Sequence, residues 1–482
     1  MVCYDTLFTT VFQKEMPFAR AIAEERAAGP RLGSIQMKGL PMSAPRLAVT
    51  TSDTLPPEAD CVVIGGGIVG VCTAYWLARA GHKVVLLEKG VIGGEQSSRN
   101  WGWCRQQNRD ARELPLSTKS LDLWERMGAE IGDSLGFRRC GLLYLSNDEA
   151  EIEGWAKWGR FARGEGIDTR MLGAEEAATR GAATGRRWKG GVWSPTDGTA
   201  DPARAAPLIA HAVEKLGGHV VQRCAARGIE RSGGRVSAVV TERGTVRTPS
   251  AVVAGGAWAA SFLRQLGIFF PQASARSSIL SVAPGVTGLP DALHTRPVTV
   301  TRRADGGYTL ATSGRANLDP TPGAILGMRH FLPMFARRWR VLRPGGTQAW
   351  AAGFETRKRW ALDRPTPMER TRILDPKPDS TVIAQTLERA RALMPELKKA
   401  EVQASWGGYI DSTPDGVPVI DADIGIPGLV LAAGLSGHGF GIGPGVGHLV
   451  ADMVLARTPV TETAQYRLAR FGQSQWGKVS DF

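Results

Sequence analysis

The sequence has 482 residues, of which 43% are hydrophobic, so it can form a large core divided between two or more cooperating domains. Its formal charge of +13 favours an acidic partner, such as a phosphate-bearing cofactor, a carboxylate substrate or an anionic membrane surface. It contains neither a zinc-finger spacing nor a basic heptad region, which argues against a nucleic-acid-binding protein. Six cysteines occur without a CxxC pair, and this favours a reducing, cytoplasmic setting over a disulfide framework or a metal site.

The N-terminal residues 1–58 lack a clear hydrophobic period and are rich in Pro, Ser and Thr toward their end. They carry no basic region followed by a long apolar stretch, so a secretion signal is not predicted. We expect a flexible leader, with Met37 or Met42 as alternative starts, and we expect residues 1–41 to be dispensable for folding. The whole chain has no run of about 18 apolar residues, so no transmembrane helix is predicted.

The first regular pattern, DCVVIGGGIVGVCTAYWLARAGHKVVLLEK at residues 60–89, predicts a strand, a glycine turn, a helix and a second strand. Gly65 permits the tight turn, Gly67 lets the backbone approach a pyrophosphate, and Gly70 allows close helix packing. Glu88, eighteen residues after Gly70, can accept hydrogen bonds from a ribose. Because all these parts fall in register, the pattern predicts a dinucleotide site with phosphates at the N-terminus of the helix.

The strand and helix alternation stops after Lys89, whereas a nicotinamide enzyme would usually continue it. Strand-rich sequence returns at residues 219–258, and a strand, a glycine-dense loop and an apolar helix follow at residues 428–455. A cofactor domain built from three separated segments favours FAD over NAD and implies substrate-domain insertions between them.

Six motifs in this order resemble the FAD-dependent oxidoreductases of the D-amino-acid oxidase and glycine oxidase superfamily, with the greatest likeness to bacterial amino acid deaminases, including membrane-associated L-amino acid deaminases. The motifs are VVIGGGIVG, GEQSSR, CAARGIE, VVAGGAW, STPDGVPVID and GLSGHGFGIGPGVG. Together they extend over residues 60–456. The resemblance implies an α+β fold, in which a discontinuous, Rossmann-like FAD-binding domain of the glutathione-reductase type joins a substrate domain on a mixed or antiparallel β-sheet.

The resemblance also implies the limits of each part. We expect a leader at 1–58, an FAD-binding domain at 59–110, 195–260 and 405–456, a substrate domain at 111–194 and 261–404 with a basic insertion near 329–376, and a C-terminal tail at 457–482. The basic stretch at 329–346 fits either a solvated helix face or a surface that contacts anionic lipid.

By resemblance, the first turn and Glu88 hold the ADP half of FAD, Ser97 and Ser98 approach the pyrophosphate, and a helix from about Gly443 directs its positive end at the flavin. We do not expect His438 to act as a base. Gly255 and Gly256 alternatively only end a strand. The expected cofactor residues are Gly65, Gly67, Ile68, Val69, Gly70, Glu88, Lys89, Glu95, Gln96, Ser97, Ser98, Arg99, Ala225, Ala226, Gly255, Gly256, Trp258, Gly437, His438, Gly439, Phe440 and Gly441.

The segment RNWGWCRQQNRD at residues 99–110 passes in front of the flavin in this family, so it is expected to line the substrate cavity. Trp101 and Trp103 would form an apolar wall, and Arg105, Gln106 and Gln107 would offer polar groups to an anionic substrate. The alternative is that the tryptophans pack as core residues and Arg105 pairs with an acid.

A hairpin with its turn at Asp305 and Gly306 brings a second candidate for the substrate carboxylate. Related deaminases place an arginine here, and the register leaves either Thr301 or Arg302 at that position, because a slip of one residue reverses the face of a strand. By resemblance, Tyr409 is expected to add a hydroxyl donor beside the flavin loop.

These features predict an FAD-dependent oxidoreductase that oxidises the C–N bond of an amino acid, giving an imino acid that hydrolyses to an oxo acid and ammonia. The alternatives are oxidation of a secondary amine such as sarcosine, proline or an opine, and a flavin-binding assembly protein without turnover. We expect noncovalent FAD, no metal, O2 or a membrane quinone as electron acceptor, and peripheral contact with the cytoplasmic face of a membrane as one option. The oligomeric state, the stereochemistry and the amino acid are not predicted.

Overall fold

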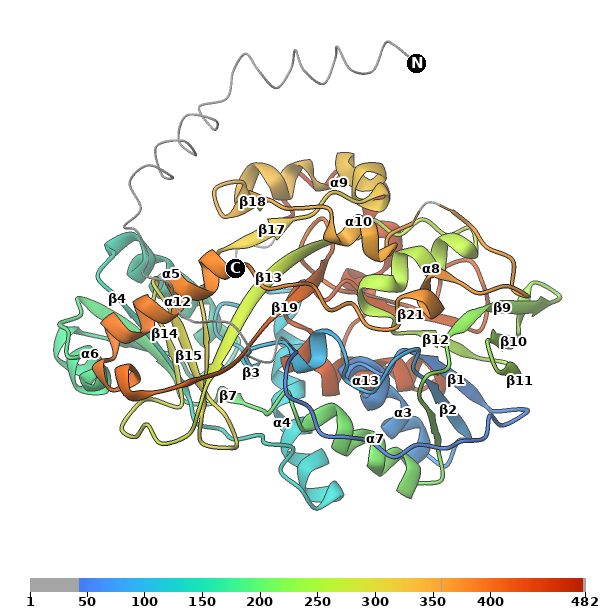
Figure 1. Ribbon diagram of the computed structural model, residues 1–482, viewed down its shortest axis with the longest axis horizontal. Coiled ribbons are helices and arrows are strands. Elements are labelled where there is room, and N and C mark those ends of the chain that lie inside the picture. The colour runs from blue at the N-terminus through green and yellow to red at the C-terminus, as the bar shows by residue number, and fades with distance from the viewer. Residues whose placement is uncertain (1–42, 357, 480–482) are drawn as a thin grey trace, which may run out of the picture. The chain divides into compact units, whose positions relative to one another are not determined.

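The computed structural model describes residues 43–356 and 358–479, which include two large β-sheets and the helices packed on them (Figure 1). The predictions for residues 1–41, including their dispensability and the alternative start at Met37, lie outside the described residues. None of the helices within the described ranges is long and apolar enough to cross a membrane.

The first sheet has six strands, and the five from β21 to β8 run parallel to one another. Strands such as VVLL at Val84–Leu87 are continuous apolar runs, because both faces of a parallel sheet are covered. The strand order is β20 (Val419–Asp421), β21 (Leu429–Ala433), β12 (Ala251–Val253), β1 (Cys61–Ile64), β2 (Val84–Leu87) and β8 (His219–Val221). Strands from three separated parts of the chain thus meet in one sheet.

One face of this sheet is covered by helices and the other by a small antiparallel sheet (Figure 1). Alternate residues of β1 show the division, since Val63 packs on the helix side and Val62 on the other side. The covering helices are α3 (Ile68–Arg79), α4 (Leu114–Ile131), α7 (Ala205–Lys215) and α13 (Gly439–Val454), and the small sheet consists of β9 (Ala226–Ser232), β10 (Arg235–Thr241) and β11 (Gly244–Arg247).

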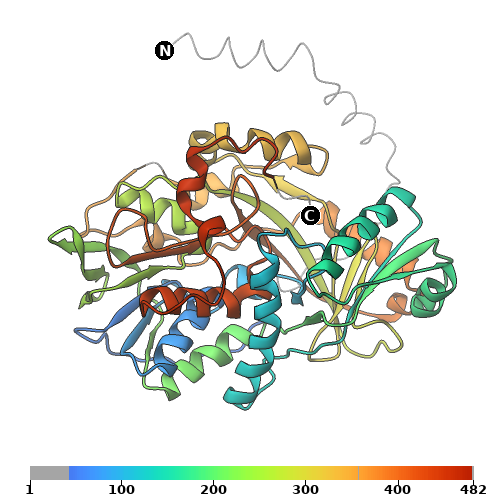
Figure 2. The same cartoon turned by 180° about the vertical axis from the view of Figure 1, so that it is seen from behind.

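Helix α13 packs closely against α3, and α4 crosses it (Figure 2). A Cβ added at Gly447 would lie 2.4 Å from the Cβ of Cys72, so glycine is needed for this approach. On the α4 side, Trp124 donates its indole N–H to the Gly441 carbonyl at 2.9 Å. These contacts fix the N-terminus of α13, which begins at Gly439 and not near Gly443 as predicted.

The second sheet has ten strands, most of them antiparallel, with parallel pairs β4–β14 and β17–β18. Its strands are β4 (Leu142–Ser146), β5 (Arg170–Leu172), β6 (Gly190–Ser194), β13 (Ala273–Val282), β14 (Ala292–His294), β15 (Thr299–Arg302), β16 (Tyr308–Ala311), β17 (Ala316–Leu318), β18 (Leu342–Pro344) and β19 (Val402–Ser412). The predicted α+β class, with one Rossmann-like and one mixed sheet, is confirmed.

Further helices, two short strands and several 3-10 turns connect and cover the sheets. They are α5 (Glu149–Gly164), α6 (Ala174–Arg180), α8 (Ala259–Gln265), α9 (Pro322–Arg338), α10 (Gln348–Ala352), α11 (Pro367–Arg370), α12 (Ser380–Leu393), β3 (Trp103–Cys104), β7 (Gly198–Thr199), η1 (Gln96–Ser98), η2 (Ala182–Thr184), η3 (Gly256–Trp258), η4 (Pro395–Lys399), η5 (Ala464–Tyr466) and η6 (Leu468–Gly472).

The part of the predicted leader that the structure describes is packed on the first sheet. Ser52 donates its backbone N–H to Val220 at 3.0 Å, and Leu47 donates its own to Ala203 at 2.9 Å. The side chain of Gln222 in turn donates to the Val49 carbonyl. The expectation of little fixed structure is therefore wrong for residues 43–58, because backbone hydrogen bonds hold this extended segment where side-chain periodicity gives no signal.

Candidate functional site

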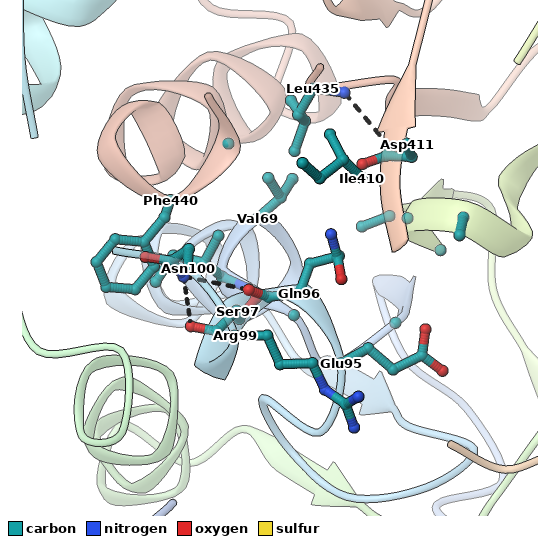
Figure 3. Close-up of a pocket in the computed structure, with 18 of the residues that line it drawn as sticks. Val69, Glu95, Gln96, Ser97, Arg99, Asn100, Ile410, Asp411, Leu435 and Phe440 are labelled. Carbon is teal, nitrogen blue, oxygen red and sulfur yellow. Dashed lines mark hydrogen bonds between the residues drawn. The ribbon is translucent and has the colours of Figure 1, made fainter. Parts of the chain in front are cut away.

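A cavity of about 390 Å3 lies at the carboxyl edge of the first sheet, where β19 and the N-terminus of α13 also meet (Figure 3). Ligands of open α/β sheets bind at this edge, because the loops there diverge and the helix N-termini point inward. At one end the cavity is lined by the glycine turn after β1, and at the other end by tryptophans, arginines and His438.

The glycine turn has the geometry that the sequence predicts. Gly65 has a φ of +113°, and a Cβ there would lie 2.4 Å from the Ala254 carbonyl oxygen. A Cβ at Gly70 would lie 1.8 Å from the Gly65 carbonyl oxygen, so Gly70 serves packing and does not line the cavity. The backbone N–H of Ile68, in the first turn of α3, donates to the Ser97 hydroxyl at 2.8 Å. This turn leaves room for a pyrophosphate to approach the backbone.

Glu88 follows β2 and lines the cavity at the end formed by the glycine turn. Its carboxylate accepts the backbone N–H of Gly66 at 2.7 Å and that of Gly90 at 2.6 Å, while burial raises its pKa. Beyond it, Glu95 accepts Lys89 at 2.6 Å and the Trp258 indole at 3.3 Å. These residues form a polar rim that suits the adenosine half of a dinucleotide.

The segment after Glu95 is fixed by side-chain hydrogen bonds. Asn100 donates its amide to the carbonyls of Gln96 at 3.1 Å and Ser97 at 2.9 Å, as the dashed lines of Figure 3 show. The guanidinium of Arg99 donates to the Gly407 carbonyl of β19 at 2.8 Å and pairs with Asp375. Residues 95–100 thus lie rigidly along the middle of the cavity.

Two expected cofactor residues besides Gly70 do not line the cavity. Ser98 directs its hydroxyl to the Glu95 carbonyl at 3.3 Å, and Ala225 donates its N–H to Glu242 at 2.7 Å. The other expected residues line it: Gly65, Gly67, Ile68, Val69, Glu88, Lys89, Glu95, Gln96, Ser97, Arg99, Ala226, Gly255, Gly256, Trp258, Gly437, His438, Gly439, Phe440 and Gly441.

The N-terminus of α13 closes the far end of the cavity. His438 directs its Nδ1 to a Glu113 carboxylate oxygen at 3.0 Å, and burial lowers its pKa to about 4. An imidazole with a pKa of about 4 is a weak base at neutral pH, which argues against His438 as a general base. The positive end of the α13 dipole faces the cavity and would stabilise negative charge on a bound ring system.

The segment with two tryptophans forms the part of the wall beside the first turn of α13. Trp103 donates its indole N–H to the Thr301 hydroxyl at 2.7 Å and packs edge-on against Trp101 and Tyr144, with ring centroids 5.8 Å apart in each pair. Both tryptophans line the cavity, and Trp103 also belongs to a buried cluster. For Trp103 the two readings of the sequence therefore hold together, since its side chain is both a core residue and part of the cavity wall. Trp101 is only partly buried, and within the described residues Arg105 pairs with no acid.

Arg105 lines this wall, whereas the second candidate for the carboxylate does not. Arg302 is 48% exposed and lies 3.6 Å from Asp291 on the outer side of β15. Its neighbour Thr301 faces inward and binds Trp103. The alternation of a strand accounts for this correction, since adjacent side chains point to opposite faces.

Two more expected substrate residues are turned away from the cavity. Tyr409 donates its hydroxyl to Asp319 at 2.7 Å, while its neighbours Gly408 and Ile410 line the cavity. Gln106 donates its side-chain amide to Thr118 at 2.7 Å and accepts from Thr196 at 3.1 Å. The expectation that Tyr409 and Gln106 contact the substrate is thus corrected, because the polar groups of both side chains are already hydrogen-bonded within the protein.

Several lining residues were not named individually in the sequence-based prediction, among them Asn100, Arg109 and Asp411. Arg109 and Asn100 lie on the segment 99–110 that was expected to line the cavity, but only the chain path shows that their side chains turn inward. Asp411 lies beside Ile410 in Figure 3, accepts the backbone N–H of Gly434 at 2.8 Å, and has its pKa raised to about 6 by burial. Its place directly before the STPDG motif is the signal that would have found it.

Comparison with known proteins decides the family of the chain. The family described as "DAO: FAD dependent oxidoreductase" matches residues 60–453. The chain belongs to this family. Its members are FAD-dependent. The glycine turn after β1, Glu88 and the cavity that they line fit that cofactor.

Individual DAO relatives differ in what they act on. A glycine oxidase of Geobacillus kaustophilus is 25% identical over 85% of this chain and 97% of the relative, and a sarcosine oxidase subunit beta of Rhizobium meliloti is 25% identical over 86% and 89%. The structure of L-amino acid deaminase from Proteus myxofaciens in complex with anthranilate superposes with a TM-score of 0.84, at 28% identity, over 90% of this chain and 98% of that one. This DAO protein is therefore an FAD-dependent amino acid or amine oxidoreductase.

Proposed function

We propose that this DAO protein oxidises the C–N bond of an amino acid and releases an oxo acid and ammonia. The observation that supports this most is the continuity of the cavity, which runs from the glycine turn and Glu88 to a buried wall with Trp103 and Arg105. FAD, when bound, would supply a two-electron acceptor between these two ends. A single cavity would thus hold both the cofactor and a small anionic substrate.

The side chains around the substrate end would orient the substrate and exclude water. Trp101 and Trp103 form an apolar face, while Arg105 presents a cation to a carboxylate. His294 and His438 are buried and their pKa values fall to about 4, so both are neutral near pH 7. Because neither is set up to take a proton, the amine of the substrate would enter in its neutral form.

The product separates this proposal from oxidation of a secondary amine. Purified holoenzyme is incubated with an artificial electron acceptor and with matched pairs of substrates, such as alanine and N-methylalanine. A primary amino acid should give ammonia and oxo acid in equal amounts. Release of formaldehyde from the N-methyl compound, without ammonia from any primary amino acid, would instead establish the secondary-amine activity that the sarcosine-oxidising relative suggests.

We propose that FAD is bound noncovalently. No cysteine lines the cavity within residues 43–356 and 358–479. Precipitation of the holoenzyme with acid should therefore release the yellow colour into the supernatant. Colour that stays in the pellet would show a covalent link.

We also propose that the outer face of α9 contacts an anionic membrane. Figure 1 places α9 at the periphery beside β17 and β18, and its side chains include arginines next to large exposed apolar groups. The most exposed apolar side chains of α9 are Ile325, Met328 and Leu332, at 56%, 58% and 50%. A basic helix with an apolar face is typical of proteins that lie on a bilayer surface. Contact of this kind would favour a membrane quinone over O2 as electron acceptor.

Flotation with lipid vesicles tests this surface. The protein should float with vesicles that contain phosphatidylglycerol and much less with vesicles of phosphatidylcholine alone, because the basic side chains need an anionic surface. The double variant Met328→Ser, Leu332→Ser should lose flotation. The control Leu216→Ser removes an apolar side chain that is 44% exposed on the distant α7 and should float normally. Equal flotation of both variants would contradict the proposal.

A further inference from the structure

Arg109 is a buried cation at the cavity wall, and no carboxylate of the described residues is hydrogen-bonded to it. The residue is 3% exposed, lines the cavity, and lies between β3 and α4. Its Nη1 is fully buried and has no hydrogen-bond partner, while its Nε donates only a long bond of 3.4 Å to the Arg105 carbonyl. Within the described residues, no ion pair joins Arg109 to an Asp or Glu.

The acidic groups closest to this arginine are engaged elsewhere. Asp197 accepts the backbone N–H of Gln106 at 2.7 Å and of Gln107 at 3.1 Å. Glu113 accepts from His438. Their charges balance the site at long range, but neither carboxylate reaches the donor of Arg109. Burial and the like charge of Arg105 lower the pKa of Arg109 to about 9.

A buried cation that is hydrogen-bonded to no carboxylate is costly unless an anion binds to it, and the side chain of Arg109 lines the cavity. We propose that Arg109 binds the carboxylate of the substrate and so selects carboxylated amines over simple ones. This inference rests on the proposed function. This carboxylate site would lie on the segment between β3 and α4 and not on the hairpin, where Arg302 faces solvent.

Arg105 is the weaker of the two donors. Its Nη1 already donates to the Gln107 carbonyl, and it lies 3.5 Å from the Tyr144 hydroxyl. We therefore expect Arg105 to assist as a second contact, with less of its hydrogen-bonding capacity available for the substrate.

Binding of a nonreactive acid to the holoenzyme tests the assignment without turnover. Propionate and propionamide have nearly the same shape, and their Kd values can be measured from the change in the flavin spectrum. The wild-type protein should bind propionate at least tenfold more tightly than propionamide. Equal affinity for the two compounds would overturn the proposal by itself, whatever any variant does.

Variants then locate the cation. Arg109→Leu should weaken propionate binding by about 30-fold or more, the effect of removing one partner of a buried charge pair. Arg105→Leu should weaken it less, and Arg302→Leu, the exposed control, should leave it unchanged. If Arg109→Leu does not retain FAD, Arg109→Lys replaces it and should weaken binding in part, because a point charge cannot form a two-pronged contact.

An Arg109 variant that holds FAD and still prefers propionate as strongly as the wild type would refute the inference, as would a larger effect from Arg105→Leu. The two proposals fail separately. Preference for the acid without reduction of the flavin by any amine would leave Arg109 as an anion site and remove the amine oxidation. Reduction by amines with or without a carboxylate would keep the oxidation and remove the role of Arg109.

Discussion

Replacing Gly70 with alanine should abolish FAD binding and lower the thermal stability of the protein. The added Cβ would lie 1.8 Å from the carbonyl oxygen of Gly65, which is backbone of the cofactor turn itself and cannot rotate away. Separating α3 from this turn would displace the N–H groups that are expected to face the pyrophosphate. Overpacking costs about 3 kcal/mol or more when no side chain can move to relieve it.

The measurement is the ratio of flavin to protein after purification, together with Tm. Gly154→Ala is the matched control, because Gly154 is also helical and a Cβ there would meet no atom within 4 Å. This control should keep its flavin and gain slightly in Tm, since alanine favours a helix over glycine. A Gly70→Ala protein with full flavin content would show that the turn does not hold the cofactor.

Replacing His438 with asparagine should make the protein more stable toward acid. The pKa of His438 is about 4 in the folded protein and about 6.5 for an exposed imidazole. The unfolded chain therefore binds an additional proton below about pH 6.5, and stability falls as the pH decreases toward about 4. Between pH 7 and pH 5 this residue alone should remove about 2 kcal/mol of stability.

Asparagine is neutral at every pH and can still donate to Glu113. The variant should therefore not show the loss of stability that protonation of His438 causes. The free energy of unfolding is measured at both pH values for both proteins. His294 has the same pKa direction, whereas burial raises the pKa of Asp197 and Asp411; these groups are present in both proteins and cancel in the comparison. His82→Asn, at an exposed imidazole, is the control. If the free energy of unfolding falls by the same amount from pH 7 to pH 5 in the His438 variant and in the wild type, the prediction is contradicted.

Residues whose roles depend on the backbone could be placed from the sequence. The positions of Gly65, Gly70 and Glu88 follow from the spacing of one strand, turn and helix, and that spacing fixes their geometry locally. Trp103 and Arg105 were also placed correctly at the cavity, through the family resemblance of the segment that carries them.

Side chains on strands were harder to place, because neighbouring residues face opposite sides. Arg302 lies next to Thr301, whose side chain faces inward and binds Trp103. Tyr409 lies next to Ile410, which lines the cavity. For β15, only its pairing with β14 and β16 determines which side chains face the interior and which face solvent. A sequence carries this register weakly when both faces of the sheet are covered.

Contacts between distant segments were not predictable at all. The segment after α11 packs beside Lys89 and Glu242 at the glycine-turn end of the cavity. There Arg372 forms a two-pronged pair with Glu242 at 2.7 and 2.6 Å, and its carbonyl accepts Lys89 at 2.7 Å. Residues 329–376 were recognised only as a basic insertion. Their return to the cofactor site depends on tertiary packing, and no local pattern of charge or hydrophobicity encodes it.

Anaerobic reduction of the bound flavin tests the central claim most directly. The holoenzyme is mixed without O2 with paired L and D amino acids, with their N-methyl derivatives, and with the corresponding amines that lack a carboxylate. We expect loss of the yellow colour with one enantiomer of at least one amino acid and none with the amine that lacks the carboxylate. A flavin that stays oxidised with every compound would contradict oxidation of a C–N bond and leave a flavin-binding protein without this activity.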